Sequence, residues 1–418
     1  VFRDFKNTGD MDYVVSWFYR AAEYIQGTQI RIGLVATNSI TQGEQVPVVW
    51  GLLFGRYRVK IHFAHRTFAW ESEARGKAHV HVVIIGFGAF DTGNKRIYDY
   101  DTDAEHPLVS EANNISPYLT PGSDSFVTKR TAPVADVPEM RCGNKPSDGG
   151  NFILTDAEKK ELLAVEPAAA KFLKRFTGSE EFINGNMRWC LWLKDAKPAE
   201  LRDLPKVMKR VEAVKAFREK STAAPTRKAA QKPTLFFYIS QPATKYILVP
   251  EVSSERRNYI PIDFMSPDVI SANTNFLVAS DSLYLFGMLT SAMHMAWVRQ
   301  VGGRLKSDYR YSGSMVYNNY PWPAAVTDKQ QAAVEAAAQA VLDARAKFPT
   351  ATLADLYDPL MMPAPLLKAH QALDRVVDRC YRSEPFPSDR HRVEYLFALY
   401  EKITAPLVAA AKPKRKRR

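Results

Sequence analysis

Two short segments of the sequence carry side chains suited to contacts with nucleic-acid bases. The first, Phe63-Ala-His-Arg-Thr-Phe68-Ala-Trp70, places aromatic rings at the end of a predicted strand. Such rings can stack on a base extruded from a duplex, because every base presents a flat π face. Aromatic rings between two strands also commonly belong to the hydrophobic core. Both interpretations stay open for Phe68 and Trp70.

The second segment runs from Gly302 to Ser312 and alternates charged residues with other types. Its charged residues are Arg304, Lys306, Asp308 and Arg310. If the segment is one extended strand, the period of two places all of these on one face. Lysine donates to guanine O6 and N7, and aspartate accepts from the cytosine amino group. A solvated edge strand with an ion pair has the same pattern, so a base-contacting edge and a merely charged edge remain alternatives.

Three further patterns resemble functional motifs but have simpler explanations. Gly86-Phe-Gly88 lacks the third glycine and the ribose-binding acid of a dinucleotide fold, so it predicts a turn. Asp148 followed by Glu158-Lys-Lys resembles a nuclease metal site, but Thr155 and Glu158 predict a capping box at a helix start. Gly143–Gly150 contains Asp-Gly, which predicts a tight turn whose N–H groups could also meet a phosphate.

The composition is that of a folded protein with a basic excess. The chain has 418 residues, of which 46% are hydrophobic and 24% charged, and this predicts two or three domains. It has no apolar run long enough for a transmembrane helix, and its three cysteines lack disulfide or metal-site spacing. The net charge of +12 suits a polyanion partner, and the basic tail after residue 411 adds non-specific phosphate attraction. Because the chain opens at Val1 without a signal peptide, we expect a piece of a longer protein.

The periodicity of apolar residues predicts the helices and strands that position the two segments described first. Alternating helices and strands, ending in a hairpin, predict part of an open α/β sheet near the N-terminus. A middle region with β-rich segments follows, and the chain is helical from Thr327, where a capping box with Gln330 is predicted. The expected helices cover residues 13–25, 45–54, 327–348, 364–382 and 389–404, and the expected strands 31–37, 59–64, 79–87, 235–240, 245–249 and 275–279.

Several stretches between residues 10 and 325 match one known family in the family's own order. They are Asp12–Glu23, Leu34–Gln45, Phe63–Trp70, Gly76–Phe87, Gly143–Gly150, Arg188–Trp192, Glu255–Pro261, His294–Arg299 and Tyr317–Pro321. With these stretches the chain resembles the C-terminal part of MmeI-like (type IIL/IIG) restriction–modification proteins. Those proteins fuse a nuclease, an adenine-N6 DNA methyltransferase, a target recognition domain and a helical C-terminal segment.

The resemblance implies a fold and a domain order. Residues 1–98 would be the C-terminal half of a class I DNA methyltransferase domain, a partial Rossmann-like α/β sheet. Residues 99–325 would form a mixed α+β target recognition domain that binds DNA, and residues 326–418 an all-α segment with a basic tail. The expected partners are double-stranded DNA and the missing N-terminal nuclease and methyltransferase halves, in the bacterial cytoplasm and not at a membrane.

One departure from the family limits what this chain can do by itself. The family's glycine-rich S-adenosylmethionine loop and its Asn-Pro-Pro-Tyr/Phe motif are absent, and the chain contains no Pro-Pro dipeptide. That motif supplies the acceptors that activate the adenine amino group. We therefore expect no complete catalytic site and no metal site here, with S-adenosylmethionine bound by the intact parent but not by this chain.

The resemblance also assigns roles to particular residues. Phe68 would stack on the flipped adenine, with Trp70 as the second choice. Lys306 and Asp308 occupy the positions that vary with one base pair of the target. Asn273 and Thr274 are candidates for another base, because asparagine suits adenine N6 and N7. The residues expected to hold DNA phosphates are Arg304 and Arg310.

Two functions of different classes fit these observations. In the first, the chain is part of a bifunctional enzyme that recognises a DNA sequence and methylates adenine N6. In the second, it is a stand-alone DNA-specificity module that works with a separately encoded catalytic subunit. An open reading frame that continues upstream into Asn-Pro-Pro-Tyr/Phe would favour the first.

Overall fold

The computed structural model describes residues 11–70, 80–100 and 106–411, with side chains up to residue 405. The chain forms two compact units. The first comprises Val1–Asp136, Ala296–Ala324 and Glu384–Arg418, and the second comprises Val137–Met295 and Ala325–Ser383. Each unit is therefore assembled from segments that lie far apart in the sequence.

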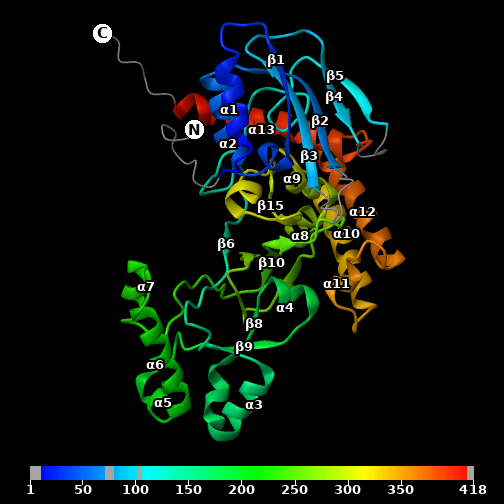
Figure 1. The fold of residues 1–418 in the computed structure, drawn as a ribbon. Coiled ribbons are helices and arrows are strands. Elements are labelled where there is room, and N and C mark those ends of the chain that lie inside the picture. The colour runs from blue at the N-terminus through cyan, green and yellow to red at the C-terminus, as the bar shows by residue number, and fades with distance from the viewer. Residues whose placement is uncertain (1–10, 71–79, 101–105, 412–418) are drawn as a thin grey trace. The chain divides into compact units, whose positions relative to one another are not determined.

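A five-stranded mixed sheet with the order β1-β3-β2-β4-β5 is the framework of the first unit (Figure 1). β3 is antiparallel to both β1 and β2, β2 is parallel to β4, and β5 is antiparallel to β4. The expected strands at 31–37, 59–64 and 79–87 are confirmed, and β2 continues past its expected end to Trp70. The strands are β1 (Arg31–Thr37), β2 (Lys60–Trp70), β3 (Val80–Gly88), β4 (Lys95–Asp99) and β5 (Leu108–Ala112).

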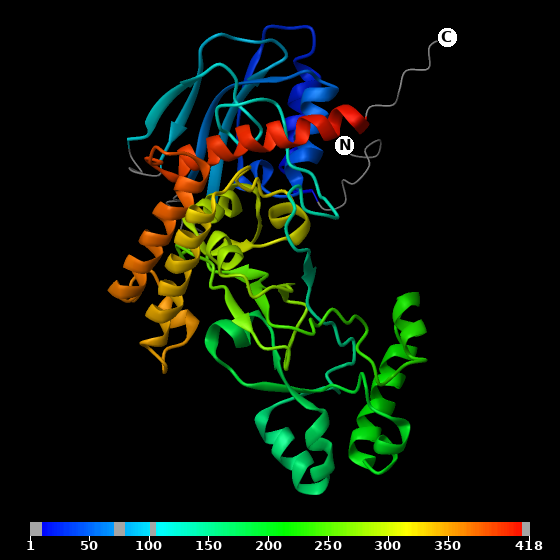
Figure 2. The same cartoon turned by 180° about the vertical axis from the view of Figure 1, so that it is seen from behind.

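Helices from both ends of the sequence accompany this sheet. The expected helices at 13–25 and 45–54 are α1 (Val15–Tyr24) and α2 (Gln45–Gly55). α1 buries Val15, Phe18 and Ala22, whose spacing of three and four residues defines one helix face. Figure 2 shows α13 (Asp389–Ala411), the helix expected at 389–404, running across the sheet. The unit also contains η1 (Asn38–Thr41), the end of α9 (Ala292–Val301), β15 (Gly303–Leu305), β16 (Asp308–Arg310) and the π-helical turn η3 (Gly313–Tyr317).

The turn predicted at Gly86-Phe-Gly88 is wrong, because both glycines belong to strand β3. The ring of Phe63 on β2 lies directly over Gly86, where an added Cβ would come within 2.0 Å of a ring carbon. Glycine is required here so that an aromatic ring of the neighbouring strand can cover the backbone. These glycines therefore serve sheet packing and form no nucleotide-binding loop.

The second unit contains two four-stranded sheets and most of the helices. One sheet has the order β12-β10-β14-β6 and the other β13-β8-β9-β7. The expected strands at 245–249 and 275–279 are β10 and β14, whereas 235–240 makes only an isolated bridge between Lys145 and Tyr238. The strands are β6 (Met140–Cys142), β7 (Ile153–Leu154), β8 (Leu173–Thr177), β9 (Arg188–Leu191), β10 (Tyr246–Pro250), β11 (Val252–Ser253), β12 (Asp263–Met265), β13 (Val269–Ser271) and β14 (Asn275–Val278).

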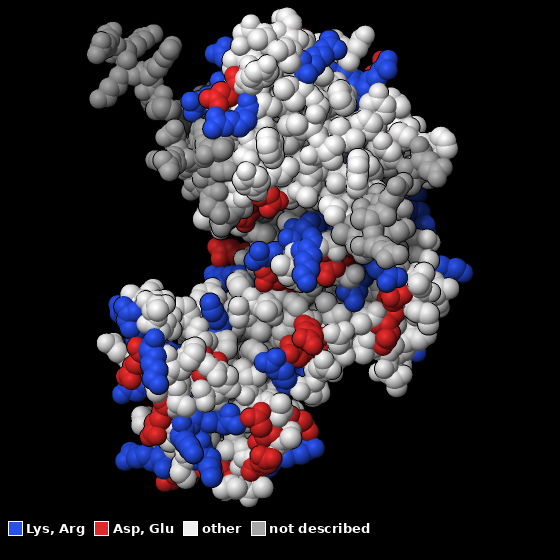
Figure 3. Space-filling model, in the orientation of Figure 1, with Lys and Arg blue, Asp and Glu red and all other residues white. Residues whose placement is uncertain are grey.

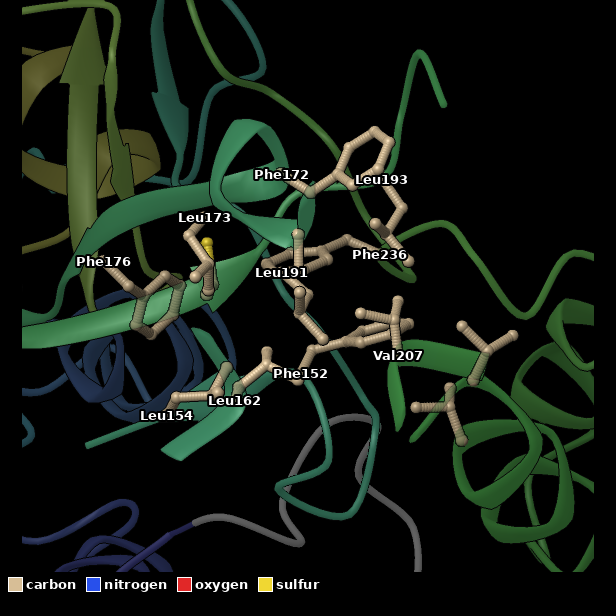
Figure 4. Close-up of a cluster of buried hydrophobic side chains, with 14 of the residues drawn as sticks. Phe152, Leu154, Leu162, Phe172, Leu173, Phe176, Leu191, Leu193, Val207 and Phe236 are labelled. Carbon is tan, nitrogen blue, oxygen red and sulfur yellow. The ribbon is translucent and has the colours of Figure 1, made fainter. Parts of the chain in front are cut away.

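The segment expected to be a strand at 235–240 is used in the core instead. Phe236 is buried in the hydrophobic cluster beside β8 and β9, where its ring stacks on Phe152 at 5.9 Å (Figure 4). Val207, Val211 and Val214 of helix α6 (Pro205–Glu219) belong to the same cluster, so the helix packs one apolar face on the sheet.

Two helices of the second unit, α3 (Asp156–Val165) and α10 (Asp328–Ala346), begin at the caps that the sequence predicted. Thr155 with Glu158 and Thr327 with Gln330 form the expected capping boxes of α3 and α10. Among the described residues after 326, only helices occur, which confirms the all-α C-terminal segment. The helices of the second unit are α3 (Asp156–Val165), η2 (Pro167–Phe172), α4 (Ser179–Asn184), α5 (Pro198–Arg202), α6 (Pro205–Glu219), α7 (Ala224–Ala229), α8 (Leu283–Thr290), α10 (Asp328–Ala346), α11 (Leu353–Leu356) and α12 (Ala364–Tyr381).

The fold class is therefore the expected mixture of an α/β sheet, a mixed α+β region and a helical segment. Within the described residues, no helix is long and apolar enough to cross a membrane.

Candidate nucleic-acid interface

A cavity of about 400 Å³ lies in the first unit and brings together segments from three parts of the sequence. Phe68 and Tyr100 contribute from the β2 and β4 side, Arg304 from β15, and Asp389 from the start of α13. The volume lies within the range of roughly 300–1,000 Å³ that is usual for small-molecule pockets. The arginines that line the cavity are Arg66, Arg299, Arg304 and Arg390.

Phe68, near the end of β2, and Tyr100, just after β4, line this cavity, whereas Trp70 is not among its lining residues. The ring of Phe68 lies 4.8 Å from that of Tyr100 and 6.1 Å from that of Trp70. Phe68 is half-buried and Trp70 is 46% exposed, so neither belongs to the closed core. Between His65 and Phe68 the register against β3 shifts by a β-bulge, a feature that redirects side chains at strand ends. The tertiary structure thus leaves both rings accessible.

The segment from Gly302 to Ser312 was expected to be one extended strand, and this expectation is wrong. β15 and β16 form an antiparallel hairpin in which Leu305 lies opposite Asp308 and Arg304 lies opposite Tyr309. Opposite residues of a hairpin point to the same face, so Arg304 shares a face with Tyr309 and Asp308 shares one with Leu305. The charged residues therefore do not share one face, because Lys306 and Ser307 form the turn between the two strands.

Lys306 occupies the first position of this turn in the left-handed region, with φ of 57°. Glycine is the usual residue there, because a side chain is strained in this conformation. Lys306 is nevertheless exposed at the tip of the hairpin. Strain kept at an exposed position is a reason to look for a function of that side chain.

Arg304 stabilises the hairpin from inside. Its guanidinium lies 4.2 Å from the ring centre of Tyr309, and its Nη1 donates to the carbonyl of Ser307 at 3.3 Å. Its Nε donates to the Gln42 side chain at 3.4 Å, on the loop after η1. Part of the hydrogen-bonding capacity of Arg304 is therefore used within the protein. Arg310 is exposed on β16.

The other expected base contacts, Asn273 and Thr274, lie in the second unit on the turn between β13 and β14. The hydroxyl of Thr274 accepts from the Ser179 amide at 3.1 Å, and its carbonyl accepts from the Glu251 amide at 2.9 Å. Thr274 is thus tied into its own unit. The carbonyl of Asn273 accepts from the Cys142 thiol at 3.3 Å, and its partly exposed amide side chain stays available.

The Gly143–Gly150 segment forms the expected turn, but its polar groups are occupied by the fold. The buried carboxylate of Asp148 accepts from the amides of Gly150 at 3.1 Å and Phe152 at 2.6 Å. Arg218 is fully buried beside it and donates only to backbone carbonyls, those of Pro146, Ser147, Ala229, Lys232 and Leu235. Burial lowers the pKa of Arg218 from its ordinary value, and the charge of Asp148 opposes that effect.

The nuclease-like pattern at Asp148 and Glu158 does not build a metal site. Glu158 accepts from the Thr155 amide at 2.8 Å and pairs with Arg210 at 3.1 Å. These hydrogen bonds hold the pKa of Glu158 below its usual value. Nowhere in the part of the chain that the structure describes do three potential metal ligands come together.

Comparison with known proteins matches most of the chain to one family. Models of three MmeI domains match in sequence order: the DNA-methyltransferase domain over residues 1–99, the target recognition domain over 121–324 and the C-terminal domain over 326–408. The chain belongs to the MmeI-like family. The resemblance seen in the sequence is thus confirmed.

Two relatives of this MmeI-like chain are longer than it is. It is 42% identical over 405 residues to DNA methyltransferase A of Bacillus subtilis (strain 168), covering 97% of this chain and 45% of the relative. It is 49% identical to type IIL restriction-modification enzyme MmeI, solved in complex with DNA, with a TM-score of 0.86 over 97% of this chain and 54% of MmeI. The chain spans about half the length of these relatives.

Some residues of the site in this MmeI-like chain were not singled out from the sequence. Arg299, Asp389 and Tyr100 line the cavity although they lie far apart along the chain. The only sequence signals were the family stretch ending at Arg299 and the helix expected to begin at 389. Neither signal could show that these residues face the same space as Phe68.

Proposed function

We propose that this chain recognises a specific sequence in double-stranded DNA, as part of an enzyme that methylates adenine N6. The observation that carries the proposal is the cavity lined by Phe68 on one side and by Arg304 of the hairpin on another. A half-buried aromatic ring that lines a cavity suits a flipped base, and a strained, charged hairpin tip suits an intact base pair. Membership of the MmeI-like family, one of whose members was solved with DNA, supports this assignment.

Individual residues take the following roles in this proposal. Phe68 stacks on the extruded adenine, with Trp70 beside it as a second ring. Lys306 donates to a guanine from the hairpin tip, and Asp308 accepts from the cytosine of the same pair. Asn273 contacts a further base, with Thr274 supporting its turn.

The DNA backbone is held by arginines in the same proposal. Arg310 is exposed and contacts a phosphate, whereas Arg304 adds positive potential while its guanidinium stabilises the hairpin. A DNA substrate also implies a location beside the chromosome in the bacterial cytoplasm.

S-adenosylmethionine is the methyl donor of the complete enzyme in this proposal, but the described residues do not fit it. Gly86 and Gly88, the glycine pair that most resembles a nucleotide-binding loop, lie within strand β3, with the Phe63 ring over Gly86. This leaves no glycine-rich loop to cradle a nucleotide among the described strands. We expect the purified 418-residue chain neither to bind the cofactor nor to methylate DNA, as calorimetry and a methyl-transfer assay would show.

A further methyltransferase part, with a nuclease before it, completes the protein in this proposal. Among the described strands, β1 lies at the edge of its sheet and its Val35 is 48% exposed, and helix α1 exposes Trp17 at 59%. Figure 3 shows few charged side chains over β1–β3. An apolar edge strand of this kind favours pairing with further strands. Residues 1–98, 99–325 and 326–418 would then be the methyltransferase back half, the recognition domain and the helical support.

The alternative is a stand-alone DNA-specificity module that works with a separate catalytic subunit. The exposed β1 edge fits this alternative equally, because the missing strands could come from another polypeptide. Sequencing the DNA upstream of the codon for Val1 separates the two. A reading frame that reaches Asn-Pro-Pro-Tyr/Phe supports one polypeptide.

The proposal is tested by exchanging the charges at the hairpin tip. The variant Lys306→Glu with Asp308→Arg should shift the preference at one base position from G toward C, each lost base contact costing about 1–3 kcal/mol. The measurement is sequencing of the duplexes that the purified chain selects from a randomised-site library. Lys174→Glu with Asp268→Arg is the matched control, because it exchanges the charges of a surface pair elsewhere, separated by 2.6 Å. An unchanged preference, or one relaxed at every position, would contradict these roles.

A further inference from the structure

A chain of contacts connects the hairpin to the start of helix α13. The carboxylate of Asp389 pairs with Arg299 of α9 at 2.5 Å and with Arg392, one turn along α13, at 2.9 Å. Arg299 also donates from Nε to the hydroxyl of Tyr309 on β16 at 3.3 Å. Tyr309 is buried and its ring supports the Arg304 guanidinium.

The end of this chain of contacts is the turn itself. Arg304 binds the carbonyl of Ser307, the residue directly after Lys306. The direction of the Lys306 side chain therefore depends on where Arg304 is held, and Arg304 is held between Tyr309 and Gln42. Asp389 fixes Arg299, Arg299 fixes Tyr309, and Tyr309 fixes Arg304.

We propose that Asp389, through Arg299 and Tyr309, is the positioning residue that sets the base specificity of the Lys306 hairpin. This inference rests on the proposed function, because it assumes that the hairpin contacts bases. A helix from the C-terminal segment thereby controls which base pair is accepted by a hairpin of the recognition domain. Asp389 itself touches no base in this arrangement.

The physical reason lies in the geometry of the guanidinium. Arg299 donates from Nη1 to Asp389 and from Nε to the Tyr309 hydroxyl. Because the guanidinium is planar, the bond to the carboxylate fixes its plane and thereby the direction of Nε. Removing the negative charge takes away one of the partners that hold the Arg299 guanidinium, so the hairpin is held less firmly while its strand pairing stays. Discrimination at one base should then fall, although the protein still folds and still binds DNA.

The experiment compares Asp389→Asn, Asp389→Glu and Tyr309→Phe with the unaltered chain in the randomised-site selection. At the position altered by the Lys306/Asp308 exchange, Asp389→Asn should lower the selection ratio at least about fivefold, the lower end for one base contact. Tyr309→Phe, which removes one oxygen only, should lower the ratio at that same position, and Asp389→Glu should restore most of it. Asp343→Asn, a surface aspartate that accepts from Gln339, is the matched control.

The outcomes separate this inference from the proposed function. If Asp389→Asn lowers the selection ratio equally at every base position and also lowers the melting temperature, Asp389 serves folding and the inference is overturned. Unchanged preference in Asp389→Asn and Tyr309→Phe, while the Lys306/Asp308 exchange alters one position, would overturn the inference alone. If the unaltered chain selects no sequence, the proposed function fails and this inference fails with it.

Discussion

Among the described residues, four other than glycine lie in the left-handed region, and two of them, Ser147 and Lys306, have opposite surroundings. Ser147 has φ of 43° in the Gly143–Gly150 turn of the second unit, and Lys306 has φ of 57° at the hairpin tip of the first. The carbonyl of Ser147 accepts from buried Arg218 at 3.0 Å, so that turn is tied to the fold. The Lys306 side chain is exposed.

The difference shows how a functional turn can be told from a structural one. Strain at Ser147 is offset by the hydrogen bonds that Arg218 makes to five backbone carbonyls. Such a turn has its polar groups satisfied internally and leaves little for a ligand. At the Lys306 turn, Arg304 donates a hydrogen bond to the carbonyl of the next residue, Ser307. The Lys306 side chain itself stays exposed, which is the arrangement that recognition needs.

Removing Arg218 should break the structural turn and produce the largest effect. Arg218→Met leaves several buried carbonyls without a donor, and each unsatisfied group costs about 1–3 kcal/mol. We expect the free energy of unfolding to fall by at least about 3 kcal/mol. Urea unfolding of the variant, beside the exposed Arg202→Met as control, measures this loss. A change no greater than that of the control would mean that the turn does not depend on Arg218.

Removing the aromatic wall near the hairpin should affect activity and leave stability nearly intact. Phe68→Ala removes a stacking contribution of about 1–3 kcal/mol per base, so methylation should fall while sequence preference stays. The measurement requires this chain joined to the methyltransferase part proposed above. Trp70→Ala tests the second ring, and Tyr238→Ala removes an exposed aromatic ring in the other unit as control. Full methylation by Phe68→Ala would assign its ring to packing alone.

Acid should weaken the second unit through a buried histidine. His370 is fully buried, its Nε2 bonds the Tyr357 hydroxyl at 2.8 Å, and burial lowers its pKa well below the ordinary value. Below pH 6.5 the unfolded chain binds a proton at this histidine and the folded chain does not. The free energy of unfolding therefore decreases as the pH is lowered, by up to about 1.4 kcal/mol per pH unit. The slope of the unfolding free energy from pH 7.5 to 5.5 should be smaller in His370→Gln. Equal slopes in the two proteins would contradict this assignment.

Relieving the strain at the hairpin tip should have the smallest effect on stability. Glycine removes a left-handed strain of about 1–2 kcal/mol and adds about 0.5–1 kcal/mol of unfolded-state entropy. Lys306→Gly should therefore raise the melting temperature slightly or leave it unchanged, while selection at one base position is lost. A clearly lowered melting temperature would place Lys306 with Ser147 as a structural residue.

Most of the elements that local patterns predicted are present in the structure. The capping boxes at Thr155 and Thr327 and the apolar face of α1 depend on residues within one turn of each other, so spacing reveals them. The strand expected at 235–240 failed because Phe236 is held by the core and not by a strand partner. The turn expected at Gly86 failed because the Phe63 ring that requires glycine there comes from another strand.

For the site, the sequence alone determined the residue types and the family, and the tertiary structure decided their geometry. Phe68, Lys306 and Asp308 could be named from residue chemistry and resemblance. That Lys306 sits in a turn, on a hairpin anchored by Arg299 and Asp389, depended on contacts between residues 90 positions apart. Such contacts leave no periodic trace in a sequence, because their partners become neighbours only when the chain closes on itself.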